Sequence, residues 1–393
     1  MSRNIALYPW FKFFGSMLFW QAIWFLFFQE ALSASEAILL YAAFDIATTV
    51  LEVPSGYLSD RVGRRLTLIL SALASVAGML LILLGDAFWI FALAQVFLGA
   101  GAALVSGTDS ALLYESLAEE GREGEIERCE ILAWRASFTA LAISAVTGGG
   151  LMDFFETAPF LASALAGMVG VGIAVSFREP PHKKGHAGEG GWLGAPDAYG
   201  VLGWIFCLSV SMYVFSHVPF VFGQPFILEA LESVEMSADA PLVSGAVTAA
   251  MMVVSVATSW AAPAMRRTMG LSALLLFAFA MQIGLIAGLT ISGDVLAIAL
   301  LLLRMVPDSL SKPFILARIQ PLLGDAHRAT YLSMQSLAGR LVLSGTLVVF
   351  SFDASSEAAM SFTEMQPILF WYATVGLMLL IALGATRGLA RER

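Results

Sequence analysis

The chain has 393 residues, of which 59% are hydrophobic and only 13% are charged. Soluble domains carry about 25% charged residues, so the composition excludes a soluble globular protein and indicates a helical protein that crosses a membrane many times. The formal net charge of -9 excludes nothing by itself, because the charges of a membrane protein divide between its two sides.

Hydropathy predicts six membrane spans in the first half of the chain, each near the length of about 20 residues that a bilayer requires. They cover residues 10–28, 37–58, 66–85, 88–116, 131–152 and 159–177. A polar, glycine-rich segment without periodicity follows and is predicted to be a flexible linker. Six further spans cover residues 199–228, 241–262, 271–291, 295–323, 330–352 and 367–386. We therefore predict an all-α membrane protein of twelve transmembrane helices, with an N-terminal six-helix half (1–178), a cytoplasmic linker (179–198) and a C-terminal six-helix half (199–393).

The basic residues fall on one side of this topology. Every second loop and both termini carry Lys or Arg, as at Arg3, Arg122 and Arg266. The opposite loops carry acids only, as at Asp86 and Glu156. Because basic loops stay on the cytoplasmic side, we expect a multi-pass protein of the inner cell membrane with both termini in the cytoplasm. We expect it to act as a monomer surrounded by lipid.

Short motifs recur in the two halves. The second span is followed by GYLSDRVGRR and the eighth by APAMRRTMG, so a basic turn recurs in equivalent loops. The fourth span contains Asp109 and Ser110, and the tenth contains Asp308 and Ser309. Internal repeats are typical of transporters, although chance explains the Asp-Ser echo equally well.

The segment GYLSDRVGRR, from Gly56 to Arg65, combines a glycine, a loop acid and spaced arginines. It resembles the loop between the second and third helices of the major facilitator superfamily, and the six-plus-six topology extends this resemblance over the whole chain. In that family the loop acts as a conformational latch on the cytoplasmic side. The resemblance implies the major facilitator fold, secondary transport and a gating motif, which comprises Gly56, Asp60, Arg61, Gly63, Arg64 and Arg65.

The chemistry of this motif agrees with a latch. Asp60 can accept hydrogen bonds from the N-terminus of a neighbouring helix, where the helix dipole favours negative charge. Arg64 can pair with an acid such as Glu115 at the inner end of the fourth span. Arg61 and Arg65 also fit a role in setting topology. The second basic turn lacks the acid, so the latch is predicted to be stronger in the N-terminal half.

Ionisable residues inside the spans are candidate functional residues, because a charge at the bilayer centre costs about 2.5 to 3.5 kcal/mol. Asp45 and Glu52 lie on nearly one face of the second span. Asp45 is predicted to couple protons or recognise a cation, or alternatively to stabilise helix packing. Glu52 is predicted to support the latch. Asp109, near the inner mouth of the fourth span, fits a gating role and a helix end equally well.

The C-terminal half contributes intramembrane cations. Arg304, Asp308 and Lys312 are spaced at four-residue intervals and so share one face of a helix, and Arg340 adds a cation in the eleventh span. These groups either bind a charged substrate or form salt bridges with acids of the other half, such as Asp45. Aromatic residues are also dense in the first and seventh spans, where they serve packing or line a cavity for an amphipathic substrate.

We predict a secondary transporter that works by alternating access and couples the efflux of a small amphipathic compound to protons. The alternative within transport is a proton-linked carrier of an organic anion or zwitterion, bound by Arg304, Lys312 and Arg340. A polytopic membrane enzyme acting on lipids and a sensor that has lost transport are alternatives from other classes. His182 and His186 lie in the linker without a third ligand, so we expect no metal site, and we expect no cofactor and no nucleic-acid partner.

Overall fold

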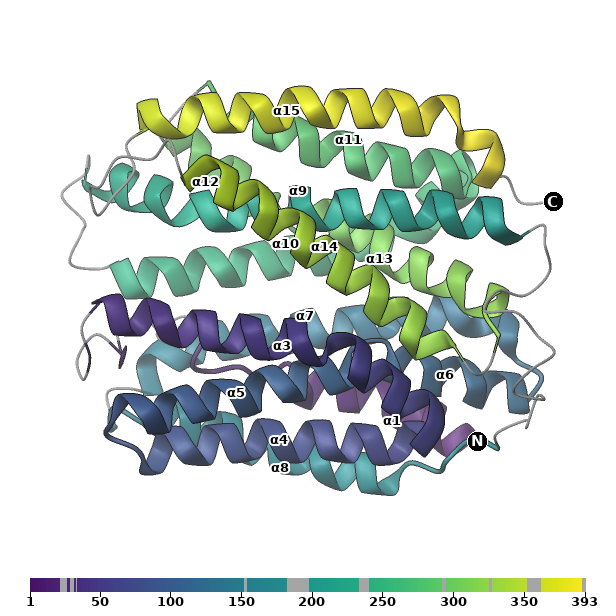
Figure 1. Cartoon of the computed structure of the whole chain (residues 1–393), viewed down its shortest axis with the longest axis horizontal. Helices are drawn as coiled ribbons and strands as arrows, with labels where there is room; N and C mark the ends of the chain where they lie inside the picture. Colours follow the sequence, from purple (N-terminus) through teal and green to yellow (C-terminus); the bar gives the residue numbers. More distant parts are fainter. Residues whose placement is uncertain are drawn as a thin grey trace. The chain divides into compact units, whose positions relative to one another are not determined.

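The computed structural model describes residues 1–21, 27–28, 32, 34–151, 154–181, 198–232, 240–291, 295–324, 327–351 and 362–390. Most of the predicted linker, residues 182–197 with His182 and His186, lies outside the described residues. The described part of the chain folds into helices, as the composition predicted (Figure 1).

The helices follow one another in chain order in two sets, before and after the predicted linker. The first part of the chain forms α1 (Ser2–Gly15), α3 (Ala34–Val62), α4 (Arg64–Leu84), α5 (Phe88–Val105), α6 (Thr108–Glu119), η1 (Glu123–Glu125), α7 (Ile126–Leu151) and α8 (Ala158–Ser176). The second part forms α9 (Ala198–Glu232), α10 (Ala240–Met269), α11 (Leu271–Leu289), α12 (Val295–Leu302), α13 (Val306–Ile319), η3 (Gln320–Leu322), α14 (Arg328–Ser351), α15 (Phe362–Ala385) and η4 (Arg387–Ala390).

Among the described residues, eight helical stretches are long and apolar enough to cross a membrane. They coincide with the predicted third to ninth spans and with the twelfth. Helices α3 and α14 run through the predicted second and eleventh spans. Their amino acids are those of membrane helices, with long aliphatic side chains facing outward and small residues where helices approach closely.

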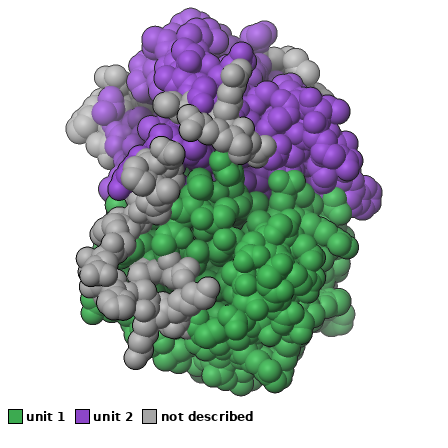
Figure 2. Space-filling model, turned by 90° about the vertical axis from the view of Figure 1, so that its right-hand side faces the viewer, with its two compact units in different colours: residues 1–194, 316–337 green, residues 195–315, 338–393 purple. Residues whose placement is uncertain are grey.

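The helices divide into two compact units (Figure 2). Unit 1 contains Met1–Gly194 together with Leu316–Leu337, and unit 2 contains Ala195–Ile315 together with Ala338–Arg393. Unit 1 thus includes one segment from the second half of the chain, residues 316–337. That segment holds the end of α13, η3 and the start of α14, and it packs with the helices of the N-terminal part.

Three predicted spans are interrupted, which corrects the expectation of continuous helices. The first span breaks after α1, where the backbone N–H of Phe19 donates to Ser163 Oγ at 3.1 Å instead of to a helix carbonyl. The fourth breaks between α5 and α6 at Gly107, whose φ of 71° is a left-handed conformation that glycine adopts without strain. The tenth breaks between α12 and α13, where Pro307 lacks an N–H and suits the first turn of the new helix.

These breaks matter for function because they set the position of the two Asp-Ser pairs. Asp109 lies in the first turn of α6, and Asp308 lies in the first turn of α13. Both aspartates therefore stand near free backbone N–H groups at a helix start, where negative charge is favoured. Hydropathy averaged over a whole span does not report such an interruption.

Candidate gating and coupling sites

The predicted latch loop is a single-residue turn between α3 and α4. Gly63 has φ 120° and ψ 152°, a conformation essentially restricted to glycine. The carboxylate of Glu179, just after α8, accepts hydrogen bonds from the backbone N–H groups of Arg64 (2.7 Å) and Arg65 (2.8 Å). This carboxylate thus satisfies two orphan donors at the start of α4. Sequence reasoning missed Glu179 because it lies far from the loop in the chain.

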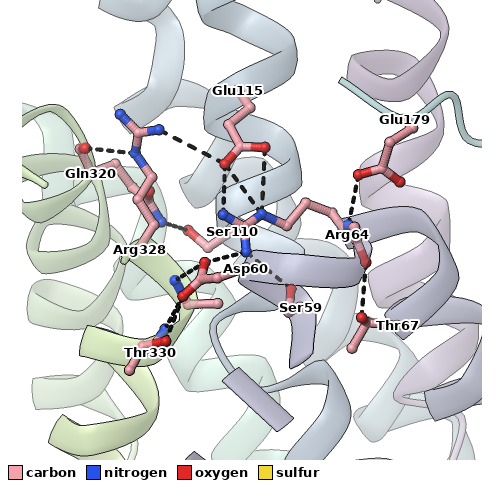
Figure 3. A network of polar contacts seen from close by, with 12 residues as sticks. Ser59, Asp60, Arg64, Thr67, Ser110, Glu115, Glu179, Gln320, Arg328 and Thr330 are labelled. Carbon is pink, nitrogen blue, oxygen red and sulfur yellow. Dashed lines mark hydrogen bonds and ion pairs between the residues drawn. The ribbon is translucent and has the colours of Figure 1, made fainter. Parts of the chain in front are cut away.

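Arg64 is the centre of a buried ionic network (Figure 3). Its guanidinium pairs with Asp60 and, at 2.9 Å, with Glu115, and it donates to Ser59 Oγ at 3.1 Å. The pair expected between Arg64 and Glu115 is present. Both carboxylates are paired with this one buried cation, so removal of Arg64 would leave two acids without their guanidinium partner.

Asp60 joins this network to the start of α14. Its carboxylate accepts hydrogen bonds from the backbone N–H groups of Ala329 (3.3 Å) and Thr330 (3.0 Å) and from the Thr330 hydroxyl (2.5 Å). Figure 3 shows Asp60 between Arg64 and Thr330. The contact predicted between this acid and the N-terminus of a neighbouring helix is therefore present, and the partner is the segment 316–337 that packs with unit 1.

Two glycines let this segment approach closely. A Cβ at Gly56 would lie 2.7 Å from Ser333 Oγ and 3.0 Å from the Ala329 carbonyl oxygen, and a Cβ at Gly107 would lie 2.7 Å from Leu332 Cβ. Larger residues at either position would displace the segment, as expected where small residues set the distance between membrane helices.

Arg328, at the start of α14, adds two further contacts between the segment and α6. Its guanidinium lies 3.8 Å from Glu115 and 4.6 Å from the centroid of the Tyr114 ring. Arg61 and Arg65 stay outside the buried network. Arg61 is exposed and lies over the Tyr57 ring, while Arg65 donates to the Val175 carbonyl oxygen at 2.9 Å.

The two acids of the second span lie in different environments on α3. Asp45 is partly buried near the middle of the helix. Glu52 is buried and accepts a hydrogen bond of 2.5 Å from Ser106 Oγ, at the break between α5 and α6. Glu52 therefore stabilises the helix interruption that precedes Asp109.

Asp109 lies in a polar cluster between α1, α6 and α7. Its carboxylate pairs with Lys12 Nζ at 2.7 Å. The next residue, Ser110, donates to Glu130 Oε1 at 2.5 Å and accepts from Gln320 Nε2 at 3.1 Å. Sequence reasoning missed the roles of Lys12, Glu130 and Gln320.

A sequence signal for Glu130 was available. The span was predicted to begin at residue 131, but α7 begins at Ile126. The buried residues Ile126, Glu130, Ala133 and Ser137 follow helical spacing. Extension of the buried face by one turn towards the N-terminus therefore includes Glu130.

Asp308 lies in a second polar cluster, within unit 2. Its carboxylate, which is 1% exposed, pairs with Lys312 Nζ at 2.7 Å, and the Lys312 side chain is 44% exposed. Ser216 Oγ of α9 and Gln282 Nε2 of α11 approach the same carboxylate at 3.4 and 3.2 Å. Three helices of unit 2 thus place donors around one buried acid.

The remaining candidates of unit 2 surround this cluster. Arg304 lies in the turn before α13, so the expected stripe of three residues is interrupted, although Arg304 still interacts electrostatically with Asp308. His217 contacts the Tyr213 carbonyl oxygen through Nδ1 at 2.8 Å, and its ring stacks on the Tyr213 ring. Arg304 and Lys312 thus interact with the buried Asp308, and Arg340 of α14 interacts electrostatically with the neighbouring His217.

Most of the sequence matches one protein family. A family model described as Major Facilitator Superfamily matches residues 7–346. The chain belongs to the major facilitator superfamily. Because this family consists of membrane transporters, the protein is a multi-pass transporter, and the alternative of a lipid enzyme is withdrawn.

Solved structures of other major facilitator proteins share the fold. A bacterial homologue of the iron transporter ferroportin in an outward-facing state has a TM-score of 0.70 and 12% identity, with 98% of this chain and 99% of that chain covered. The human organic anion transporter MFSD10 (TETRAN) has a TM-score of 0.69 and 12% identity, with 97% and 99% covered. No curated protein matches the chain significantly. At this identity the likeness concerns the fold, and the predicted major facilitator fold is confirmed.

Proposed function

We propose that this protein is a proton-coupled secondary transporter of a small organic anion or zwitterion, and that protons and substrate meet at the Asp308–Lys312 pair. The main support is the difference in exposure between the two side chains of this pair. The acid is 1% exposed and has three polar partners, whereas the lysine is 44% exposed. A substrate can therefore reach the cation while the carboxylate stays within the helices of unit 2.

The coupling follows from charge balance. While Asp308 is ionised, it neutralises Lys312 and weakens the attraction of Lys312 for an anion. When a proton binds Asp308, Lys312 loses the compensation that this carboxylate provides, and an anionic group of the substrate can replace it. Opposite charges attract more strongly where water is partly excluded, so proton and anion enter and leave together. Arg304 and Arg340 reinforce the preference for an anion, and the neighbouring His217 interacts electrostatically with Asp308, Lys312 and Arg340.

The aromatic residues of the seventh span support the anion over the amphipathic compound. Trp204 is buried and donates through Nε1 to the Leu383 carbonyl oxygen at 3.1 Å. Phe215 is buried and packs edge to face on Phe279, with ring centroids 5.2 Å apart. Because these rings pack within unit 2, they are engaged in the core. Proton-coupled efflux of an amphipathic compound therefore becomes the second candidate.

The latch network supplies the gating part of the proposal. Alternating access requires that one side of the transporter closes while the other opens. The bonds of Asp60 to the start of α14 hold residues 316–337 against the N-terminal helices, together with the 3.8 Å contact between Arg328 and Glu115. The ion pairs of Arg64 fix Asp60 and Glu115 in place. We propose that this network forms and breaks once per cycle on the cytoplasmic side of the inner membrane, that both termini lie on that side, and that the protein acts as a monomer surrounded by lipid.

The test is proton movement in proteoliposomes with an internal pH reporter and a panel of organic anions, zwitterions and amphipathic cations. Wild type is compared with Asp308→Asn, Lys312→Gln, Asp45→Asn and the control Arg267→Gln, whose side chain is exposed on α10. We expect an anion or zwitterion to drive proton movement in wild type and control. We expect the movement to fall at least tenfold in Asp308→Asn and in Lys312→Gln.

Three outcomes contradict parts of this proposal. Proton movement that survives Asp308→Asn but disappears in Asp45→Asn moves the coupling site to α3. A response only to amphipathic cations restores the second candidate. Substrate movement without any proton movement in wild type removes proton coupling altogether. Loading substrate on one side of the vesicle then decides between efflux and uptake.

A further inference from the structure

We propose that Glu130 is a second proton-binding site, in unit 1, and that its charge controls how firmly residues 316–337 are held. The role of this site in the transport cycle rests on the proton-coupled transport proposed above. Glu130 is 4% exposed on α7. Its partners are two hydroxyl groups, those of Ser110 and Tyr8.

The charges around Glu130 do not balance. Among the described residues, Lys12 of α1 interacts with this cluster as a cation, and it is paired with Asp109 of α6 at 2.7 Å. The other titratable neighbours are Tyr8 of α1 and Cys129 of α7 itself. Two carboxylates therefore share one lysine in a buried place, and the cluster carries an excess negative charge when both are ionised. One proton on Glu130 removes that excess, and the proton enters and leaves as the carboxyl O–H bond forms and breaks.

A chain of hydrogen bonds connects Glu130 to the segment 316–337. Gln320 Nε2 of η3 donates to Ser110 Oγ at 3.1 Å, and Ser110 Oγ donates to Glu130 Oε1 at 2.5 Å. Hydrogen bonds to an ionised acceptor are about twice as strong as neutral ones, and such chains polarise one another. Ionised Glu130 therefore strengthens the hold on Gln320, and protonated Glu130 weakens it.

The amide of Gln320 has a second arrangement available. Gln320 is fully buried, and its Oε1 has no hydrogen-bond partner among the described residues. If the amide turns, Oε1 can accept from the Ser110 hydroxyl, while protonated Glu130 donates to Ser110. The donor and acceptor roles along these hydrogen bonds can thus be reversed, as a site that gains and loses a proton requires. In the reversed direction every bond is neutral and the hold on η3 is weaker.

Two measurements on the purified full-length protein in detergent test this inference without any substrate. The first is infrared difference spectroscopy of the C=O band of protonated carboxyl groups across a pH titration. We expect a titrating band in wild type that is lost in Glu130→Gln and kept in the control Glu123→Gln, an exposed residue of η1. A band that survives Glu130→Gln overturns the assignment of the proton site.

The second is hydrogen exchange of peptides covering residues 316–337, compared between variants at each pH. Glu130→Gln imitates the protonated acid, so we expect about tenfold faster exchange than wild type at high pH, from a loss of about 1.4 kcal/mol, and no difference at low pH. Ser110→Ala cuts the chain but keeps the acid, so the infrared band should remain while the pH response of exchange disappears. A normal pH response in Ser110→Ala overturns the link to the segment.

Failure here and failure of the proposed function give different patterns. If Glu130 does not titrate but proton movement in liposomes depends on Asp308, coupling belongs to unit 2 alone and the second proton site is rejected. If Glu130 titrates and exchange responds, but no substrate moves protons in wild type, the control of the segment stands and proton-coupled transport falls.

Discussion

The Asp109 site of unit 1 and the Asp308 site of unit 2 begin from the same local structure and end in different surroundings. In each, a helix break precedes an Asp-Ser pair, and a lysine Nζ lies 2.7 Å from the aspartate. Lys12 comes from α1, 97 positions away in the chain, whereas Lys312 lies one turn further along the same helix. The first ion pair therefore connects two helices, whereas the second lies within one helix and connects none. One local motif can therefore serve the fold in one unit and, by our proposal, transport in the other.

Replacement of the two lysines should give the largest difference in stability loss between the two sites. Lys12→Met leaves Asp109 and Glu130 buried without a cation, so we expect a loss of about 3 kcal/mol in the free energy of unfolding. Lys312→Met also leaves a buried aspartate, but Asp308 keeps the donors of Ser216 and Gln282 and its interaction with Arg304, and the lost cation is 44% exposed. We therefore expect a smaller loss of about 1 kcal/mol together with loss of transport. Denaturation in detergent and the liposome assay measure the two effects.

A reversed order would contradict the comparison. If Lys312→Met destabilised the protein more than Lys12→Met, the pair of unit 2 would be the structural one. The double variant Lys12→Met with Asp109→Asn is a further check, since removal of both charges should recover part of the stability that Lys12→Met loses.

Replacement of the two serines by alanine should give a smaller difference in stability loss. Ser110 bonds to Glu130 and to Gln320, both buried, so Ser110→Ala leaves two polar groups unsatisfied and should cost about 2 kcal/mol. Ser309 Oγ donates to the Val306 carbonyl oxygen of its own helix, so Ser309→Ala should cost about 0.5 kcal/mol. Thermal denaturation of both variants measures the difference, and equal losses would show that the Ser110 chain contributes little.

The smallest expected difference between the units is the stability cost of an alanine in each basic turn. Gly63 has φ 120° and Gly270 has φ 78°, so an alanine at either position should cost about 1 to 3 kcal/mol in backbone strain. At Gly63 the new Cβ would also lie 2.8 Å from the Glu179 carboxyl, whereas nothing lies within 4 Å at Gly270. We expect Gly63→Ala to be worse by about 1 kcal/mol, the value of a helix cap.

The Glu179→Gln variant tests the source of that difference. It weakens the cap of α4 without altering the turn, so the gap between Gly63→Ala and Gly270→Ala should shrink in the Glu179→Gln background. A gap that keeps its size would assign the difference to backbone strain alone.

The latch contacts were predicted in part from the sequence motif and the chemistry of its residues. The acid and the arginine of GYLSDRVGRR indicated that Asp60 would meet a helix start and that Arg64 would meet Glu115, because few groups can satisfy a buried ion. The same reasoning did not identify the helix start as that of α14, nor Glu179 as the cap of α4. Both partners lie more than a hundred positions away in the chain, and no local pattern reports such distances.

The sequence by itself determined the helical membrane fold, the predicted spans that coincide with the eight candidate crossings, the family and the chemistry of the latch. These properties follow from the transfer of apolar segments into lipid and from local motifs, and both can be read in a short window. Only the tertiary structure decided that two spans break before an Asp-Ser pair, that Lys12 neutralises Asp109, and that residues 316–337 pack with unit 1. The reason is that these features depend on pairing between distant buried polar groups, and the partner that compensates a buried charge is chosen by packing.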